Sequence, residues 1–236
     1  LAVLNALAIG YRLIDTASMY ENEVQIGNAL QQTTIPRSAI YLTTKLNNTD
    51  HGYDQALRAF DESLEKLQQD YVDLYLIHWP IKEGRKESWK ALEKIYESGR
   101  AKAIGVANYT LPFLKELESY ANMAPTLNQI EFTPWLFQEE VLKYCHQNNI
   151  QLQSYSPITR GQKFNDPRLI ALCEKYQKTP AQIILNWNIQ LGVSTIPKSS
   201  KKERLQENFD AQNFSLDAQD VELMNTFNEG FRICDD

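Results

Sequence analysis

Four side chains near the start of the chain are of types that move protons or carry charge. They are Asp15, Tyr20, Lys45 and His78. A tyrosine phenol donates a proton slowly at neutral pH until a nearby ammonium group stabilises its phenolate, and Lys45 can supply that charge. Asp15 can keep Lys45 protonated and oriented, while His78 can donate a hydrogen bond to a substrate carbonyl oxygen or help to relay the proton. Together the four groups would polarise a carbonyl group.

Each of these residues also has an ordinary structural interpretation. Asp15 can cap a helix, Tyr20 can lie at the rim of a sheet, Lys45 can be a solvated surface residue and His78 can be packed in the core. Their positions favour the chemical interpretation, because they fall at the ends of three consecutive predicted strands. The carboxyl ends of neighbouring parallel strands lie at one edge of a sheet, so the side chains can converge there.

Short β-branched or aromatic runs recur along the chain, and amphipathic segments separate them, as in βαβ units. The predicted strands are Tyr11–Asp15, Ile40–Lys45, Leu74–His78, Ala103–Ala107, Leu127–Glu131, Leu152–Ser156 and Ser194–Pro197. The predicted helices include Gln55–Leu67, a helix from near Ser88 that ends before Gly99, two that begin at Pro167 and Pro180, and Asp217–Phe227.

This alternation predicts an α/β fold, a parallel (β/α)8 TIM barrel formed by residues 1–236 as a single domain. The segment before the first predicted strand resembles the end of a helix, so we expect the first strand of the barrel to lie upstream of residue 1. Without that strand the barrel would have two unpaired edges. An open doubly wound sheet is the alternative.

Composition limits the partners of the protein. The formal net charge is -6, which gives no basic surface for nucleic acid or for an anionic membrane. No apolar run reaches the roughly 20 residues of a membrane span. The cysteines, Cys145, Cys173 and Cys234, form no Cys-x-x-Cys pair, as expected for reduced thiols of a cytoplasmic protein. We expect a monomer that binds small molecules.

Carbonyl reduction needs a hydride donor, but no Gly-x-Gly-x-x-Gly motif follows any predicted strand. The last strand instead leads through Lys198 and Ser199 into a helix that carries Arg204, Glu207 and Asn208. Late barrel strands followed by a helix N-terminus often bind phosphate, because free backbone N–H groups there favour anions. Taken alone, the same cluster is also typical of a solvated helix start.

Several motifs, read in order, resemble those of the aldo-keto reductase family. They are Asp15-Thr16-Ala17-Ser18-Met19-Tyr20, Thr44-Lys45-Leu46, Ile77-His78-Trp79-Pro80, Gly105-Val106-Ala107-Asn108-Tyr109, Asn128-Gln129-Ile130-Glu131, Tyr155-Ser156-Pro157 and Ile196-Pro197-Lys198-Ser199. The resemblance covers essentially the whole chain. The short connections after His78 and Pro157 are most similar to compact microbial members, including the 2,5-diketo-D-gluconate reductases.

The resemblance implies NADPH-dependent reduction of aldehydes, dicarbonyls or keto sugars to alcohols, with Tyr20 as the general acid. Lys45 and Asp15 would tune the phenol, and His78 would orient the carbonyl. Trp79, directly after His78, would form an apolar wall of the substrate pocket beside Tyr20 and His78, with simple packing as its alternative. The cofactor-binding residues that it implies are Asn108 and Gln129 for the carboxamide, Tyr155 for stacking on the ring, Ser156, and the group Lys198, Ser199, Arg204, Glu207 and Asn208, which would favour NADPH over NADH.

Two positions depart from the family pattern, and two rival functions remain. Ala107 replaces the usual serine, which puts one cofactor hydrogen bond in doubt, and Thr133 stands where many relatives have histidine. A catalytically silent, nucleotide-binding regulatory subunit would keep the fold without turnover. A barrel hydrolase would need a metal cluster or a nucleophile elbow, and the three histidines show no metal-binding spacing, so we predict no metal.

Overall fold

The computed structural model describes residues 1–234, and in this part of the chain seven strands form one sheet in the order β1-β2-β3-β4-β5-β6-β7. Their bounds are β1 Leu13–Asp15, β2 Tyr41–Leu46, β3 Leu74–Ile77, β4 Ile104–Ala107, β5 Leu127–Glu131, β6 Gln151–Tyr155 and β7 Ser194–Thr195. The pairs β1–β2, β2–β3, β3–β4 and β6–β7 are parallel. The protein is therefore of the α/β class with a parallel sheet, as the sequence predicts.

Helices separate successive strands along the chain. The α-helices are α1 Ala2–Ile9, α2 Glu23–Gln32, α3 Tyr53–Leu67, α4 Arg85–Glu97, α5 Leu111–Glu118, α6 Glu139–Gln147, α7 Pro167–Tyr176, α8 Pro180–Gln190, α9 Lys202–Phe209 and α10 Ala218–Asn225. Short 3-10 turns lie between them: η1 Ser18–Tyr20, η2 Arg37–Ala39, η3 Asn48–Asp50, η4 Thr159–Gly161 and η5 Asp210–Gln212. No described helix is long and apolar enough to cross a membrane.

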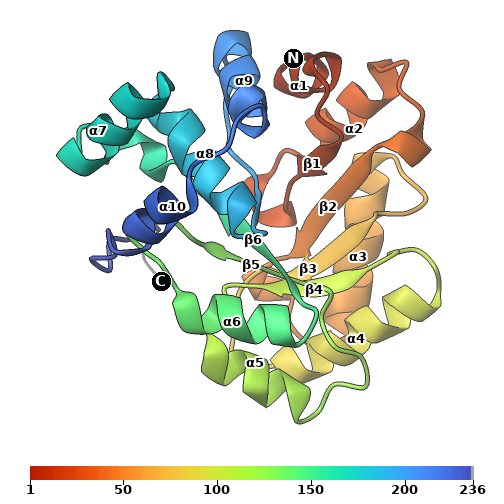
Figure 1. Ribbon diagram of the computed structural model, residues 1–236. Coiled ribbons are helices and arrows are strands. Elements are labelled where there is room, and N and C mark those ends of the chain that lie inside the picture. The colour runs from red at the N-terminus through yellow and green to blue at the C-terminus, as the bar shows by residue number, and fades with distance from the viewer. Residues whose placement is uncertain (235–236) are drawn as a thin grey trace. The chain divides into compact units, whose positions relative to one another are not determined.

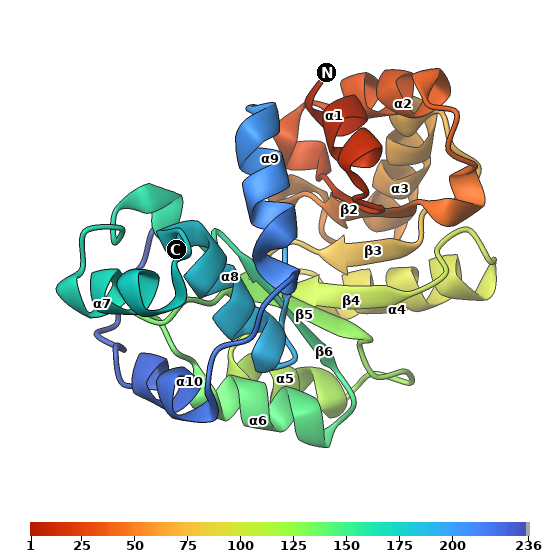
Figure 2. The ribbon, with the colours of Figure 1, turned by 45° about the horizontal axis from the view of Figure 1, so that its top comes forward.

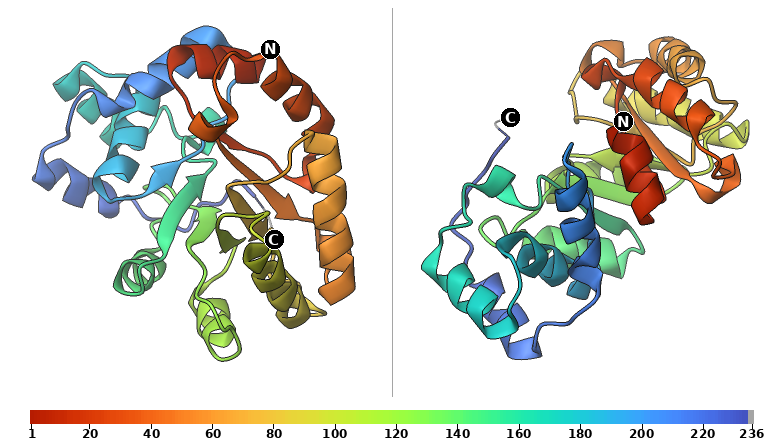
Figure 3. Two further views of the ribbon diagram at one scale, coloured as in Figure 1. Left: turned by 90° about the vertical axis from the view of Figure 1, so that its right-hand side faces the viewer. Right: turned by 90° about the horizontal axis from the view of Figure 1, so that it is seen from above.

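The chain divides into two compact units, the first formed mainly by residues 3–128 and the second mainly by residues 129–147 and 151–234. In the first unit α2, α3 and α4 lie on one side of strands β1 to β4 (Figure 1; Figure 3, left). Phe60 of α3 packs on Tyr75 of β3 with ring centroids 4.7 Å apart. Leu74 and Leu76 point to the opposite face, because side chains alternate along a strand, and there they form a buried cluster with Ala107 and Leu127.

Strands β3 and β4 of the first unit are buried on both faces, which explains their continuous apolar runs. Every residue of β3 and of β4 is buried. Helix α2 approaches α3 through Gly27, where an added Cβ would lie 2.6 Å from the carbonyl oxygen of Leu67. This close contact fixes α2 against α3, and α2 follows the turn that carries Tyr20.

In the second unit α8 is the central helix, in contact with α7, α9 and α10 (Figure 2). Both α7 and α8 begin with the predicted proline in the first turn. Thr179 caps α8 with a reciprocal capping box to Gln182, which satisfies backbone donors at the helix start. Trp187 of α8 stacks on Phe132 with ring centroids 5.3 Å apart, so the apolar face of this helix anchors the core of the unit.

The predicted elements are found, with small differences at their ends. β1 begins at Leu13 instead of Tyr11, and β7 ends at Thr195, two residues before Pro197. Helix α4 begins at Arg85, ahead of Ser88, and Gly99 follows its C-terminal cap at a φ of 76°, as a glycine stop signal predicts. The prediction of a single domain and of an additional strand upstream of residue 1 stays a prediction.

Candidate active site

The first unit brings the ends of β1, β2 and β3 to one edge of the sheet. Asp15 is the last residue of β1 and pairs in register with Thr43, two residues before Lys45. Lys45 pairs with Leu76, two residues before His78. Tyr20 ends the short turn η1, and the Ser18 hydroxyl of that turn donates to the Lys45 carbonyl oxygen at 3.0 Å. Parallel register therefore determines which side chains meet at this edge.

Lys45 is the centre of the cluster and its side chain is completely buried. Its Nζ donates to Asp15 Oδ1 at 2.5 Å, to the Thr16 carbonyl oxygen at 2.9 Å and to Tyr20 Oη at 3.4 Å. An ammonium group has three N–H donors, so each donor has an acceptor. A buried charge is tolerated only when it is paired and hydrogen-bonded in this way.

Tyr20 is the accessible member of the cluster, with 47% of the residue exposed although Lys45 beneath it is buried. The Nζ of Lys45 also lies 4.9 Å from the centroid of the Tyr20 ring. The phenol therefore has a cation against its inner side and remains open to an incoming molecule. This arrangement stabilises negative charge on the phenolic oxygen when its proton leaves.

His78 directly follows β3 and is 7% exposed. Its ring meets the Tyr20 ring edge to face, with centroids 5.5 Å apart. Burial, together with the positive charge of Lys45, lowers the pKa of His78 from 6.5 to about 3, so the imidazole is neutral at physiological pH. Its Nδ1 is buried without a hydrogen-bond partner among the described residues. Because a buried, unpaired N–H group is rare in proteins, the hydrogen is assigned to Nε2, which can then donate to a carbonyl oxygen.

Three other residues of this unit that the sequence analysis singled out are Asn108, Trp79 and Ala107. Asn108 follows β4 at a φ of 63°, and its Nδ2 donates to the His78 carbonyl oxygen at 2.9 Å. The amide therefore fixes the backbone beside the imidazole. Trp79, directly after His78 in the chain, is partly exposed, and its role in a substrate pocket stays a prediction. Ala107 is completely buried and contributes to the apolar cluster around β4.

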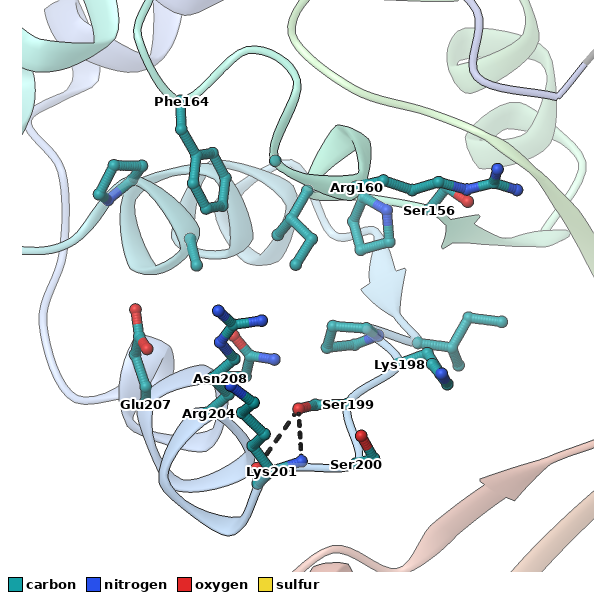
Figure 4. Close-up of a pocket in the computed structure, with 17 residues that line it drawn as sticks. Ser156, Arg160, Phe164, Lys198, Ser199, Ser200, Lys201, Arg204, Glu207 and Asn208 are labelled. Atoms are coloured by element: carbon teal, nitrogen blue, oxygen red, sulfur yellow. Dashed lines mark hydrogen bonds between the residues drawn. The ribbon is translucent and has the colours of Figure 1, made fainter. Parts of the chain in front are cut away.

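The second unit contains a cavity of about 920 Å³. Six of the residues predicted to bind a cofactor line it: Ser156, Lys198, Ser199, Arg204, Glu207 and Asn208. Figure 4 shows Lys198 to Lys201 and the side chains of α9 on one side of this cavity, with Ser156, Arg160 and Phe164 on the other. The sequence-based grouping of these residues is therefore found in the folded chain.

The electrostatics of this cavity fit a polyanion. Four cationic side chains line it, those of Arg160, Lys198, Lys201 and Arg204, against the single carboxylate of Glu207. Helix α9 begins at Lys202 with Lys201 as its N-cap, and the free backbone N–H groups of a first turn attract anions. Ser199 shapes the turn before the helix, because its hydroxyl accepts from the Lys201 backbone N–H at 3.1 Å. The donor set suits the phosphate groups of a nucleotide.

The three predicted nicotinamide residues, Asn108, Gln129 and Tyr155, do not line this cavity. Gln129 is 2% exposed, and its Nε2 donates to Gln153 Oε1 at 2.8 Å. Tyr155 ends β6 and is partly exposed. Their roles at a nicotinamide stay predictions. Trp135 is a packing residue, because it is completely buried, donates to Asp166 Oδ2 at 2.8 Å and packs on Phe227.

The pocket lining also contains residues that were not among the predicted cofactor-binding set, including the charged or aromatic residues Arg160, Phe164 and Lys201. Lys201 extends the cationic run that begins at Lys198, so its charge was a usable signal. Arg160 and Phe164 lie in the connection after Pro157, and only the path of that loop brings them to the cavity. Within residues 1–234 no group of three or more His, Cys, Asp or Glu side chains is arranged to hold a metal ion.

Comparison with known proteins places these features in one family. The family model described as "Aldo/keto reductase family" matches residues 2–167 and 162–229. A glyoxal reductase of Bacillus subtilis is 44% identical over 232 residues, which span 98% of this chain and 84% of that protein. An oxidoreductase of the same organism, named YtbE and described as uncharacterized, is 43% identical over 98% of this chain and 84% of its own length.

Solved structures agree in fold as well as in sequence. An aldo-keto reductase from a Medee basin deep-sea metagenome library is 40% identical, with a TM-score of 0.96 over 99% of this chain and 88% of that chain. A Bombyx mori aldo-keto reductase crystallised in complex with NADP is 36% identical, with a TM-score of 0.91 over 99% of this chain and 84% of that chain. The parallel sheet, the family model and these relatives together show that the chain belongs to the aldo/keto reductase family.

Proposed function

We propose that this protein is an NADPH-dependent carbonyl reductase in which Tyr20 is the proton donor. One observation carries the proposal: an exposed phenol rests on a completely buried ammonium group, with Lys45 Nζ 3.4 Å from Tyr20 Oη and 2.5 Å from Asp15 Oδ1. When bound, a reduced nicotinamide would supply the hydride for the carbonyl carbon. The carbonyl oxygen then needs a proton, and Tyr20 is the group of the cluster that is open to a substrate.

The remaining side chains of the cluster prepare this proton transfer. Lys45 stabilises the phenolate that forms when Tyr20 gives up its proton, and Asp15 keeps the ammonium group charged and in place. Neutral His78 donates a hydrogen bond from Nε2 to the substrate oxygen, which orients the carbonyl and withdraws electron density from its carbon. Trp79 forms an apolar wall of the substrate site beside Tyr20 and His78.

The cavity of the second unit supports NADPH as the donor. Lys198, Ser199 and Arg204 would hold the adenosine 2'-phosphate, with Asn208, Glu207 and Ser156 as further nucleotide contacts. Asn108 and Gln129 would bind the carboxamide, and Tyr155 would stack on the nicotinamide ring. The Bombyx mori relative that was crystallised with NADP supports this assignment.

Small aldehydes and dicarbonyls are the substrate class that we propose, with keto sugars as further candidates. The similarity to a protein named glyoxal reductase supports this choice, as does the exposure of Tyr20. The proposal includes a parallel (β/α)8 barrel to which the seven strands belong, and a monomeric, cytoplasmic protein whose three cysteines form no disulfide bond.

The test is a stopped-flow measurement of NADPH oxidation with glyoxal, methylglyoxal and a panel of aldehydes and keto sugars. The Tyr20→Phe variant is expected to lose turnover and to keep NADPH binding, because only the phenolic hydroxyl is removed. A Tyr53→Phe variant is the matched control, since Tyr53 is exposed at the start of α3 and has no assigned role. Unchanged turnover in Tyr20→Phe would refute the assignment. NADPH binding by the wild type without turnover of any carbonyl would favour the alternative of a catalytically silent, nucleotide-binding subunit.

A further inference from the structure

A loop of the second unit forms one wall of the nucleotide cavity. This pocket loop, residues 156–166, contributes Ser156, Arg160 and Phe164 to the lining, and the Phe164 ring points toward the cavity in Figure 4. Apart from the turn η4 it has no regular secondary structure. Its conformation therefore has to be maintained by contacts with its surroundings.

The backbone of the pocket loop is strained. Ser156, Thr159 and Arg160 have φ values of 47°, 53° and 50°, in the left-handed region that non-glycine residues rarely adopt. Such residues persist only where surrounding structure holds them, and they gather at ligand-binding sites. A loop with three of them within five positions would relax to other conformations if its external contacts were removed.

Trp135 donates to Asp166 at the end of the loop, and further contacts come from the C-terminal strap, which we define as residues 228–234. Glu229 forms ion pairs with Lys163 and, at 3.8 Å, with Arg168, which lies just after the loop. Lys163 Nζ also lies 4.2 Å from the centroid of the Phe231 ring. Arg160 Nη2 donates to Cys234 Sγ at 3.7 Å. The right view of Figure 3 shows the strap running beside the loop that precedes α7.

The strap is itself anchored to the body of the second unit. The buried carboxylate of Glu131, at the end of β5, accepts the backbone N–H groups of Ile233 and Cys234 at 2.7 and 3.1 Å. The Trp135 carbonyl oxygen accepts the N–H groups of Glu229 and Phe231 at 3.1 and 3.0 Å. Hydrogen bonds to an ionised, buried group are stronger than neutral ones, so Glu131 is the main anchor.

We propose that the C-terminal strap is a latch that holds the pocket loop in its nucleotide-binding conformation and thereby sets the rate at which NADP(H) leaves. The inference rests on the proposed nucleotide site. Glu131, Glu229 and Phe231 do not line the cavity, so they are positioning residues that act through Arg160 and Lys163. Removing a contact between the strap and the pocket loop raises the dissociation rate of the nucleotide, although no group that contacts the nucleotide is removed.

The test compares Glu229→Gln with Glu139→Gln. Both substitutions neutralise a carboxylate paired with a lysine, but the Glu139–Lys143 pair lies on α6, away from the cavity. NADPH release is followed by stopped-flow fluorescence after displacement by excess NADP. We expect Glu229→Gln to release NADPH about two- to five-fold faster, the range for a partly exposed ion pair, and Glu139→Gln to match the wild type. Equal release rates in all three proteins would overturn the proposal.

Two further measurements separate the latch from the nucleotide site itself. Hydrogen–deuterium exchange of the protein without nucleotide should quicken in residues 158–166 of Glu229→Gln and stay unchanged in Glu139→Gln. Failure of the wild type to bind NADPH would refute the proposed function alone. The exchange measurement would still test whether the strap holds the loop, because it is made without nucleotide. The charge-swapped variant Lys163→Glu/Glu229→Lys should recover slow release. The latch proposal would be overturned if exchange in Glu229→Gln were unchanged. It would also be overturned if the charge-swapped variant released NADPH as fast as Lys163→Glu alone.

Discussion

Removing the carboxylate beside Lys45 is expected to destabilise the fold strongly, and the effect should depend on Lys45 itself. The Lys45 side chain is 0% exposed and that of Asp15 is 9% exposed, so water can replace little of the lost interaction. Breaking a buried ion pair by removing one partner costs about 3–5 kcal/mol. Asp15→Asn keeps an oxygen acceptor, so we expect the lower end, about 3 kcal/mol of unfolding free energy.

A double-mutant cycle isolates the pair. Lys45→Met leaves the Asp15 carboxylate without its cation and should cost a similar amount, whereas Asp15→Asn/Lys45→Met leaves no uncompensated charge. The double variant should therefore be more stable than the sum of the single changes predicts, with a coupling energy of about 3 kcal/mol. Urea denaturation of the four proteins at neutral pH and low salt measures this coupling.

The pH dependence of the cycle supplies a second check. In Asp15→Asn the buried ammonium group can lose its proton and with it its uncompensated charge. The loss of unfolding free energy relative to the wild type should therefore become smaller as pH rises. Lys45→Met has no such group, and its deficit should not shrink in the same way. Additive effects within about 0.5 kcal/mol would refute the argument that the two charges stabilise each other.

Three further predictions follow from the structure. The folded-state pKa of His78, about 3, lies below the unfolded value of 6.5, so its contribution to stability is fully present above pH 6.5 and is lost as pH falls toward 3. Between pH 7 and pH 5 the wild type should lose about 2 kcal/mol more than His78→Gln in urea titrations, and an equal loss would contradict the neutral, buried imidazole. Gly27→Ala should cost about 1–3 kcal/mol in thermal or urea unfolding, since its Cβ would lie 2.6 Å from the Leu67 carbonyl oxygen, whereas Gln31→Ala on the exposed side of α2 should change stability by less than about 0.5 kcal/mol. Carbonyl reduction requires a proton from Tyr20 whereas alcohol oxidation returns one, so the two directions should show opposite pH dependences, and steady-state rates with parallel pH profiles in both directions would exclude Tyr20 as the acid.

The residues at strand ends are the part of the site that is most predictable from sequence. Side-chain alternation and the spacing of apolar runs locate a parallel strand, and parallel register then determines which strand ends are neighbours. The sequence alone therefore groups Asp15, Lys45 and His78. The cationic run from Lys198 to Arg204 was predictable for a similar reason, because the start of one helix holds it together.

Other features required contacts between distant parts of the chain. The Thr16 carbonyl oxygen accepts one of the hydrogen bonds of Lys45 Nζ. It is a backbone atom, so the residue type at that position does not predict the contact. Arg160 and Phe164 reach the cavity through a loop whose positive φ values no local pattern predicts. The anchoring of Ile233 on Glu131 joins residues that are far apart in sequence.

The sequence by itself determined the α/β class, the order of the elements and the reactive groups at three strand ends, because these depend on local periodicity and on the regular geometry of parallel strands. Only the tertiary structure decided how the ammonium group is enclosed, which loop lines the cavity of the second unit and which distant residues contact that loop. Those properties depend on burial and on hydrogen bonds between distant segments, which form only when the chain has folded.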